Sequence, residues 1–113
     1  MKRGEIWTAS GGRDYAGKPR PVLIVQDDAF EETGSVTICL LTSHGVDAPL
    51  FRPAIEPNPT NGLRERSWAM VDKITTVPRA RLGDCLGTLT AGEIAQINRA
   101  MILFLGLAAP ARA

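Results

Sequence analysis

The sequence predicts a mainly β domain of the α+β class, in which a small curled antiparallel sheet or barrel carries one C-terminal α-helix packed against it. Two patterns support this prediction. Most of the chain consists of short strand-like runs separated by loops rich in Gly, Pro and Asn, whereas the residues after position 90 repeat apolar side chains at helical spacing. With 113 residues the chain has the size of one domain, and we expect a single domain over residues 1–113.

Six segments have the composition of strands. Residues 5–9 are short and strand-like, and a Gly-rich loop follows them. Residues 20–26 contain four successive aliphatic side chains, which predicts a strand buried on both faces with Pro21 at its start. The other predicted strands are 36–42, a weak one at 50–55 interrupted by Pro53, 67–74, and a short last one at 83–89, with a single helical turn within 77–82.

The C-terminal segment predicts a helix over about residues 90–106. Thr90 and Glu93 have the spacing of a capping box, in which each side chain bonds the backbone N–H of the other residue. The apolar residues that follow recur at helical spacing, and Gly106 suits the C-terminal cap. Residues 100–105 are apolar on all sides, which indicates that a second protomer covers them in a homodimer.

Composition excludes several classes of protein. Hydrophobic residues at 44% and charged residues at 22% are globular values, and they exclude a disordered chain. A net charge of +1 excludes a polybasic nucleic-acid binder. The longest apolar run, 100–109, is half the ~20 residues that a membrane span needs, and the N-terminal residues do not resemble a signal peptide. We therefore expect a cytoplasmic protein with no membrane partner.

Charge is unevenly distributed along the chain. Residues 1–26 and residues 64–81 each carry a net charge of +3. We expect these two basic stretches to meet at one cleft as a positive patch, the alternative being solvated loops with no partner. The acidic excess lies in one block, made of Asp27, Asp28, Glu31 and Glu32.

The sequence predicts no metal site and no cofactor. The two cysteines, Cys39 and Cys85, are too few for a structural zinc site and lack CxxC spacing. Both have apolar neighbours, which favours buried thiols in a reducing compartment over a disulfide. The HExxH, GxSxG and Walker A motifs are absent from the sequence.

Polar residues at the ends of predicted strands are the candidates for chemistry. Arg20 opens the most apolar strand, and a guanidinium there can hold a phosphate or a carboxylate through two hydrogen bonds. Thr42 ends the 36–42 strand, and Ser43 and His44 follow it directly. Asp72 lies near the end of the 67–74 strand, and His44 is the only histidine of the chain.

Each of these residues also has a structural alternative. Arg20 could cap a turn, and the two hydroxyl residues at the end of the third strand could hydrogen-bond a loop. Asp72 could pair with Lys73 or Arg66. Taken singly, none of these residues defines an active site.

The order of several short segments resembles the MazF/PemK family of bacterial endoribonuclease toxins. The resemblance covers nearly the whole chain, from Lys2 to the terminal helix. It implies an SH3-like β-barrel with a C-terminal helix, usually a homodimer. It also implies metal-independent cleavage of single-stranded RNA at short sequence motifs, growth inhibition, and control by an acidic cognate antitoxin. The segments that carry it are 3–7, 20–25, 40–43, 61–63, 67–77, 81–83 and 86–89.

The resemblance also implies which residues form the site. Arg20 matches the family's central arginine, Thr42 its central hydroxyl residue, and Asp72 an acidic residue that contributes in some members. We expect these three to be catalytic. The residues expected to bind the substrate beside them are Lys18, Ser43, His44 and Arg66.

Two departures from the family pattern bear on the proton transfers. Some members carry a histidine in the first long loop, where residues 13–15 of this chain are Arg, Asp and Tyr. Some carry an arginine two positions before the acidic residue, where this chain has Met70. Asp72 is then the better candidate for the base, and His44 could substitute for the missing loop histidine.

The expected reaction suits these residues. Attack by the 2′-OH of the RNA needs stabilisation of charge on the phosphate, which Arg20 can supply, while Thr42 or Ser43 can hold a phosphate oxygen or the 2′-OH.

Two rival functions remain: a CcdB-like toxin that binds DNA gyrase without catalysis, and a degenerate member that binds only antitoxin or RNA. The aromatic residues that could stack on unpaired bases are Tyr15, Phe30, Phe51 and Trp68.

Overall fold

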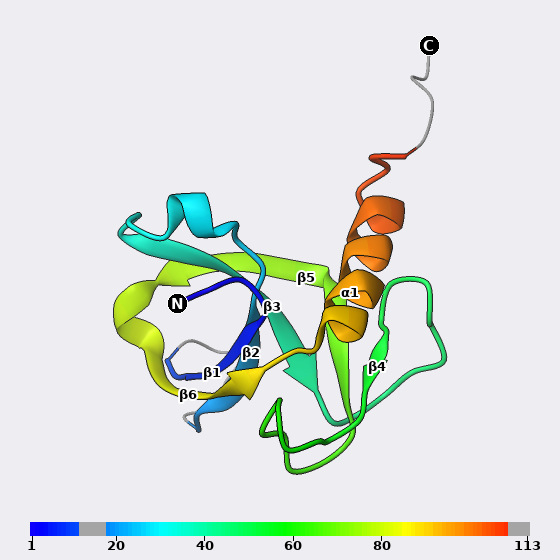
Figure 1. Cartoon of the computed structure of the whole chain (residues 1–113), viewed down its shortest axis with the longest axis horizontal. Coiled ribbons are helices and arrows are strands. Elements are labelled where there is room, and N and C mark those ends of the chain that lie inside the picture. The colour runs from blue at the N-terminus through cyan, green and yellow to red at the C-terminus, as the bar shows by residue number, and fades with distance from the viewer. Residues whose placement is uncertain (12–17, 109–113) are drawn as a thin grey trace.

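A computed structural model describes residues 1–11 and 18–108. It contains one six-stranded antiparallel sheet of order β4-β5-β3-β2-β1-β6, curled into a partly closed barrel (Figure 1). The strands are β1 (Glu5–Ala9), β2 (Arg20–Ile24), β3 (Ser35–Thr42), β4 (Ala54–Ile55), β5 (Ser67–Pro78) and β6 (Leu82–Thr88). The helix α1 (Ala91–Phe104) follows, and two 3₁₀ turns occupy Asp28–Phe30 and Arg79–Arg81.

This architecture confirms the predicted fold class and most of its elements. β1 has the predicted bounds, and the helical turn expected within 77–82 is the 3₁₀ turn Arg79–Arg81. The strand predicted at 50–55 is wrong in extent, since only Ala54 and Ile55 pair with β5. Its first residues form a turn instead, in which the N–H groups of Phe51 and Arg52 both donate to the carbonyl of Ala48.

β5 contains a bulge that the sequence pattern did not predict. Cys39 pairs with Ile74, but the next residue of β3, Leu40, pairs with Met70. Residues 71–73 therefore lie between the partners of two adjacent residues, and β5 is bent there (Figure 1). This bulge holds Asp72, one of the predicted catalytic residues.

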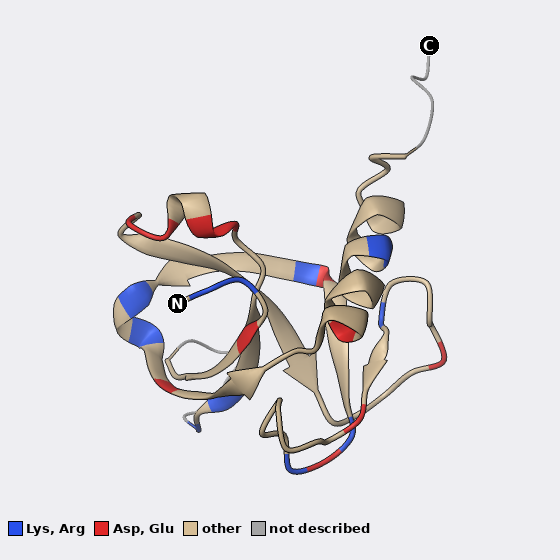
Figure 2. Ribbon diagram, viewed as in Figure 1, with Lys and Arg blue, Asp and Glu red and all other residues tan. Residues whose placement is uncertain are grey.

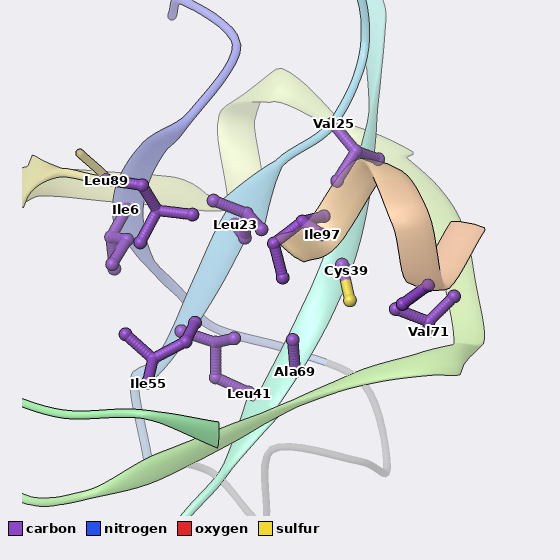
Figure 3. Close-up of a cluster of buried hydrophobic side chains, with 11 residues drawn as sticks. Ile6, Leu23, Val25, Cys39, Leu41, Ile55, Ala69, Val71, Leu89 and Ile97 are labelled. Carbon is purple, nitrogen blue, oxygen red and sulfur yellow. The ribbon is translucent and has the colours of Figure 1, made fainter. Parts of the chain in front are cut away.

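The core has two parts because β2 and β3 are covered on both faces. One cluster lies between the sheet and α1 and includes Leu23, Cys39, Val71 and Ile97 (Figure 3). The second lies on the other face and includes Val22, Ile24, Val36 and Ile38. Since side chains of a strand alternate between its faces, consecutive aliphatic residues of β2 enter different clusters. The prediction that this strand is buried on both faces is confirmed.

The two ends of α1 are built as predicted. At its start, the Thr90 hydroxyl accepts from the Glu93 N–H at 3.2 Å, and the Glu93 carboxylate accepts from the Thr90 N–H at 2.9 Å. At its end, Gly106 adopts φ +71° while its own N–H and that of Leu107 return to the last turn. The helix crosses the first core cluster and extends past the edge of the sheet (Figure 1). No helix in the described part of the chain is long and apolar enough to cross a membrane.

One of the two cysteine predictions is wrong. Cys39 is fully buried, and burial raises the pKa of its thiol to about 12. Cys85 is exposed, because β6 is an edge strand that pairs only with β1. Both are free thiols.

Candidate active site

A pocket of about 540 Å³ opens where β2 begins and β3 ends. Its apolar lining comes from separate elements and includes Leu40, Leu63, Met70 and Leu86. Its polar lining consists of Arg20, Thr42, Ser43, His44, Arg64 and Glu65, with Thr8 and Ser67 beside them. A ligand here would meet an apolar surface flanked by charged and hydroxyl groups.

The strand register explains why residues 22 positions apart in the chain meet in this pocket. β2 and β3 are antiparallel, with Val22 opposite Leu40. Moving two residues toward the start of β2 and two toward the end of β3 brings Arg20 next to Thr42. The structure therefore places Arg20, Thr42, Ser43 and His44 in one pocket, as the sequence led us to expect.

Thr42 is half-buried, and its hydroxyl has a defined orientation. The hydroxyl oxygen accepts a hydrogen bond from the His44 N–H at 3.1 Å. Among the residues that the structure describes, its O–H has no acceptor, so this donor is available to a ligand. A hydroxyl held in this way can donate to a phosphate oxygen.

Arg20 and Arg64 supply the positive charge of the pocket. Both are exposed, and neither forms an ion pair within residues 1–11 and 18–108. A guanidinium presents its N–H donors in a planar arrangement that suits two phosphate oxygens. Arg64 was not among the residues predicted from the sequence.

Asp72, one of the three residues expected to be catalytic, is not in the lining of the pocket. It lies in the bulge of β5, and both of its carboxylate oxygens accept from Arg52 at 2.9 Å. The Arg52 guanidinium lowers the pKa of Asp72 and Asp72 raises the pKa of Arg52, in each case chiefly through these hydrogen bonds. The partner of Asp72 is therefore Arg52, not Lys73 or Arg66.

The Arg52–Asp72 pair fastens the connection between β3 and β4 to β5. Backbone bonds flank the pair, since the Val71 N–H donates to the Phe51 carbonyl at 3.1 Å and the Ala69 N–H to the Pro53 carbonyl at 3.0 Å. The same connection begins with Ser43 and His44 in the pocket. The pair thus restricts the C-terminal end of the connection between β3 and β4, and the N-terminal end of this connection carries the pocket residues Ser43 and His44.

Two predicted binding residues lie outside the pocket lining. Arg66 forms an ion pair with Glu56 at 2.8 Å, and its guanidinium lies 5.0 Å from the centre of the Trp68 ring. Lys18 is exposed and precedes Pro19, which does line the pocket. Both residues are next to pocket-lining residues in the sequence, but neither lines the pocket itself.

The candidate stacking residues have different environments. Trp68 is half-buried against Gly45, where a β-carbon would lie only 2.2 Å from the indole ring. Phe51 packs against Phe104 with ring centres 5.8 Å apart, and Phe30 is exposed on a 3₁₀ turn. Tyr15 lies outside the described residues, together with Arg13 and Asp14.

The prediction that both basic stretches meet at one cleft holds for one arginine of each stretch, Arg20 and Arg64, and not for the other described basic residues of the two stretches. Lys and Arg residues are distributed over several separate parts of the fold (Figure 2). Lys2 pairs with Glu31 at 2.9 Å, and Arg3 donates to the carbonyl of Val25 and to the side chain of Asn98. Local carboxylates and carbonyls thus bind much of the basic charge. Of the described basic residues in the two stretches, those that line the pocket are Arg20 and Arg64.

Sequence reasoning missed the contribution of the segment before β5. Asn61 is fully buried, and its side-chain oxygen accepts from the N–H groups of Asn58 and Leu63. Gly62 follows with φ +68°, and a β-carbon there would lie 2.1 Å from the Leu86 carbonyl oxygen. The Asn-Gly pair was visible as a turn signal, but only the packing against β6 brings residues 63–65 into the pocket.

Comparison with known proteins identifies the family. A profile of the PemK-like, MazF-like toxins of type II toxin-antitoxin systems matches residues 2–105. The chain belongs to this family. It is 49% identical over 108 residues to a probable endoribonuclease MazF of Mycolicibacterium smegmatis, a match that covers 96% of this chain and 99% of the relative. It is 30% identical to endoribonuclease MazF9 of Mycobacterium tuberculosis, covering 95% of this chain and 98% of the relative.

Solved structures support the same assignment for this MazF-like chain. An endoribonuclease in complex with its cognate antitoxin, from a mycobacterial species, superposes with a TM-score of 0.79 at 28% identity, covering 97% of this chain and 99% of that one. A second mycobacterial endoribonuclease gives a TM-score of 0.76 at 27% identity, covering 97% and 95%. This MazF-like chain is therefore a toxin of the endoribonuclease class.

Proposed function

We propose that this MazF-like toxin cleaves single-stranded RNA at short sequence motifs without a metal ion, by attack of the 2′-OH next to the broken bond. The observation that carries the proposal is the presence of Arg20 and Thr42 in one pocket. A guanidinium that forms no ion pair with the described residues, next to an oriented hydroxyl, suits a phosphodiester, whose transition state gains negative charge on its oxygens.

Arg20 and Thr42 have complementary roles in this reaction. Arg20 holds two phosphate oxygens and stabilises the charge that develops as the 2′ oxygen approaches phosphorus. Thr42 donates its O–H to a phosphate oxygen and thereby fixes the orientation of the phosphate. Arg64 adds a second positive charge to the pocket from the segment before β5. Ser43 and His44 contact the substrate from the end of β3, with Lys18 and Arg66 at the margins.

Asp72 has a different role from the one that the sequence suggested. Its bidentate bonds to Arg52 make it a positioning residue, which holds the segment from Ser43 to Pro53 against β5. The base must then come from another group. This role predicts that loss of Asp72 weakens activity less than loss of Arg20.

The pocket and the exposed apolar end of α1 also indicate which partners this toxin binds. A pocket whose two arginines form no ion pair with the described residues suits an acidic antitoxin segment that occupies it in place of RNA. The last turns of α1 expose Ile102, Leu103, Phe104 and Leu105, each by 41% or more, which suits burial in a homodimer. We place this toxin in the cytoplasm, where its RNA substrates are found, and its cleavage of RNA inhibits translation and growth.

The test is cleavage of a 40-nucleotide RNA with a randomised centre in the presence of EDTA, followed by analysis of the new ends. We expect undiminished cleavage, with a 2′,3′-cyclic phosphate or its 3′-phosphate product on one fragment and a 5′-OH on the other. A product with a 3′-OH and a 5′-phosphate, or a loss of activity with EDTA that added Mg²⁺ restores, would contradict the proposal. Arg99→Ala serves as the control variant, since Arg99 is exposed on α1 outside the pocket.

A further inference from the structure

Glu65 differs from the other carboxylates near the site. Among the described residues it is the one carboxylate in the lining of the pocket. Asp72 is bound by Arg52, and Glu56 by Arg66, whereas Glu65 has no ion-pair partner within 4.0 Å among the described residues. A carboxylate left unpaired beside two arginines has its oxygens available to a ligand.

The backbone at Glu65 is held on both sides. After it, the Ser67 hydroxyl donates to the Glu65 carbonyl at 3.1 Å, and Ser67 itself is only 4% exposed. Before it, the buried Asn61 side chain accepts from the Leu63 N–H at 3.0 Å and donates to the Glu56 carbonyl at 2.9 Å. These anchors limit where the Glu65 side chain can reach, which is a requirement for a catalytic group.

The backbone at His44, just after the end of β3, is held in a similar way. Its backbone N–H donates to Thr42, and the next residue, Gly45, packs against the Trp68 ring. Like Glu65, it lines the pocket and has no ion-pair partner among the described residues. Two side chains that can exchange protons therefore enter the pocket from separate, anchored segments.

The other described polar side chains of the pocket are guanidinium and hydroxyl groups, which are weak proton acceptors. A guanidinium has no free lone pair to accept a proton, and the Thr42 oxygen already accepts a hydrogen bond. An ionised carboxylate only accepts protons, whereas a protonated imidazole can donate one. A carboxylate therefore suits the acceptor, and an imidazolium suits the donor.

On the basis of the proposed function, we propose that Glu65 is the proton acceptor and His44 the proton donor in RNA cleavage. Glu65 removes the proton from the 2′-OH as the bond from the 2′ oxygen to phosphorus forms. The bond from phosphorus to the 5′ oxygen breaks, and His44 gives its proton to that oxygen. The products are a 2′,3′-cyclic phosphate and a 5′-OH, with Glu65 protonated and His44 neutral, and proton exchange with water restores both.

The first experiment measures steady-state cleavage of an RNA site taken from those that the wild-type protein cuts in the randomised RNA. We expect Glu65→Gln to lower kcat by about 10²-fold or more, the usual contribution of a general base, with KM changed by less than about threefold. Its affinity for the same RNA with 2′-O-methyl at the cleavage site should remain within about threefold of wild type. The matched control is Glu32→Gln, which removes an exposed carboxylate outside the pocket and should retain full activity.

The second experiment separates the acceptor from the donor. An RNA with sulfur in place of the bridging 5′ oxygen has a leaving group that needs no proton. With this substrate His44→Ala should regain activity to within about tenfold of wild type, although it loses about 10²-fold or more on the oxygen substrate. Glu65→Gln should remain impaired on both, because the 2′-OH must still lose its proton.

The outcomes separate this inference from the proposed function. If the wild-type products carry a cyclic phosphate but Glu65→Gln retains more than about one-third of the activity, the assignment of the acceptor is overturned and the proposed function stands. Equal losses of His44→Ala on the oxygen and sulfur substrates would overturn the assignment of the donor. If wild-type cleavage leaves a 3′-OH, the proposed function itself fails, and this inference fails with it.

Discussion

The pocket and the β5 bulge contain the same kinds of charged side chain in opposite states. In the bulge, Arg52 and Asp72 bond each other through both carboxylate oxygens and are 16% and 23% exposed. In the pocket, Arg20, Arg64 and Glu65 are exposed and form no ion pair among the described residues. The paired side chains stabilise the fold, whereas the pocket side chains remain available to a ligand. Residue type is the same in the two regions, so ion pairing is what distinguishes the structural residues from the binding residues.

The sharpest test of this comparison is Arg20→Ala. Because the guanidinium stabilises developing charge and makes no ion pair in the described protein, we expect kcat/KM for RNA cleavage to fall by about 10²–10³-fold. The free energy of unfolding should change by less than about 0.5 kcal/mol, as for an exposed residue. Cleavage assays and urea unfolding measure the two effects. A variant that keeps wild-type activity would contradict the assignment of Arg20 to the site.

The converse test is Arg52→Ala, which breaks the paired cluster. It leaves the partly buried Asp72 carboxylate without its partner, and we expect a loss of about 1–2 kcal/mol in the free energy of unfolding. Activity should fall by no more than about tenfold, because the pair acts only through the segment that carries Ser43 and His44. Urea unfolding and cleavage assays on the same preparations provide the comparison. A stability equal to wild type with activity abolished would show that the comparison is wrong.

A smaller effect is expected from pH. The pKa of Asp72 is lowered in the folded protein, chiefly by its hydrogen bonds to Arg52, from an ordinary value of 3.8. The pair therefore contributes its full stabilisation above that ordinary value, and the contribution is lost as the pH falls through the lower folded pKa. The melting temperature, measured between pH 7 and pH 3, should decline at the acid end. This decline should be shallower in Asp72→Asn than in the wild-type protein. Identical acid limbs for the two proteins would contradict this explanation.

The sequence predicted the fold where local pattern and packing agree. The capping box at Thr90 and Glu93, the doubly buried β2 and the glycine that ends α1 each leave a local signature, and the structure contains all three. Arg20 and Thr42 could also be brought together, since their positions follow from the ends of two strands. The pairing register of β2 and β3 then places the two residues next to each other.

The misses arose where distant segments decide the outcome. Residues 71–73 contain no Gly, Pro or Asn that would have indicated a bulge. Nothing in the sequence therefore indicated that Asp72 would form hydrogen bonds with Arg52. Glu65 lies in a charged stretch that resembles any solvated loop, and only the anchors at Asn61 and Ser67 bring it to the pocket. Summed charge along the chain was equally uninformative, because nearby carboxylates and carbonyls bind several of the basic side chains.

The contrast between the two cysteines has a practical consequence for spectroscopy. Cys39 is buried with a pKa of about 12, so almost none of it is thiolate near neutral pH and alkylating reagents cannot reach it. Cys85 is exposed on the edge strand β6, next to Leu86 in the pocket wall. A dye on Cys85 would lie on the edge strand, within one residue of the pocket lining. The natural sequence thus carries a single attachment point for a fluorophore that reports on RNA or antitoxin binding.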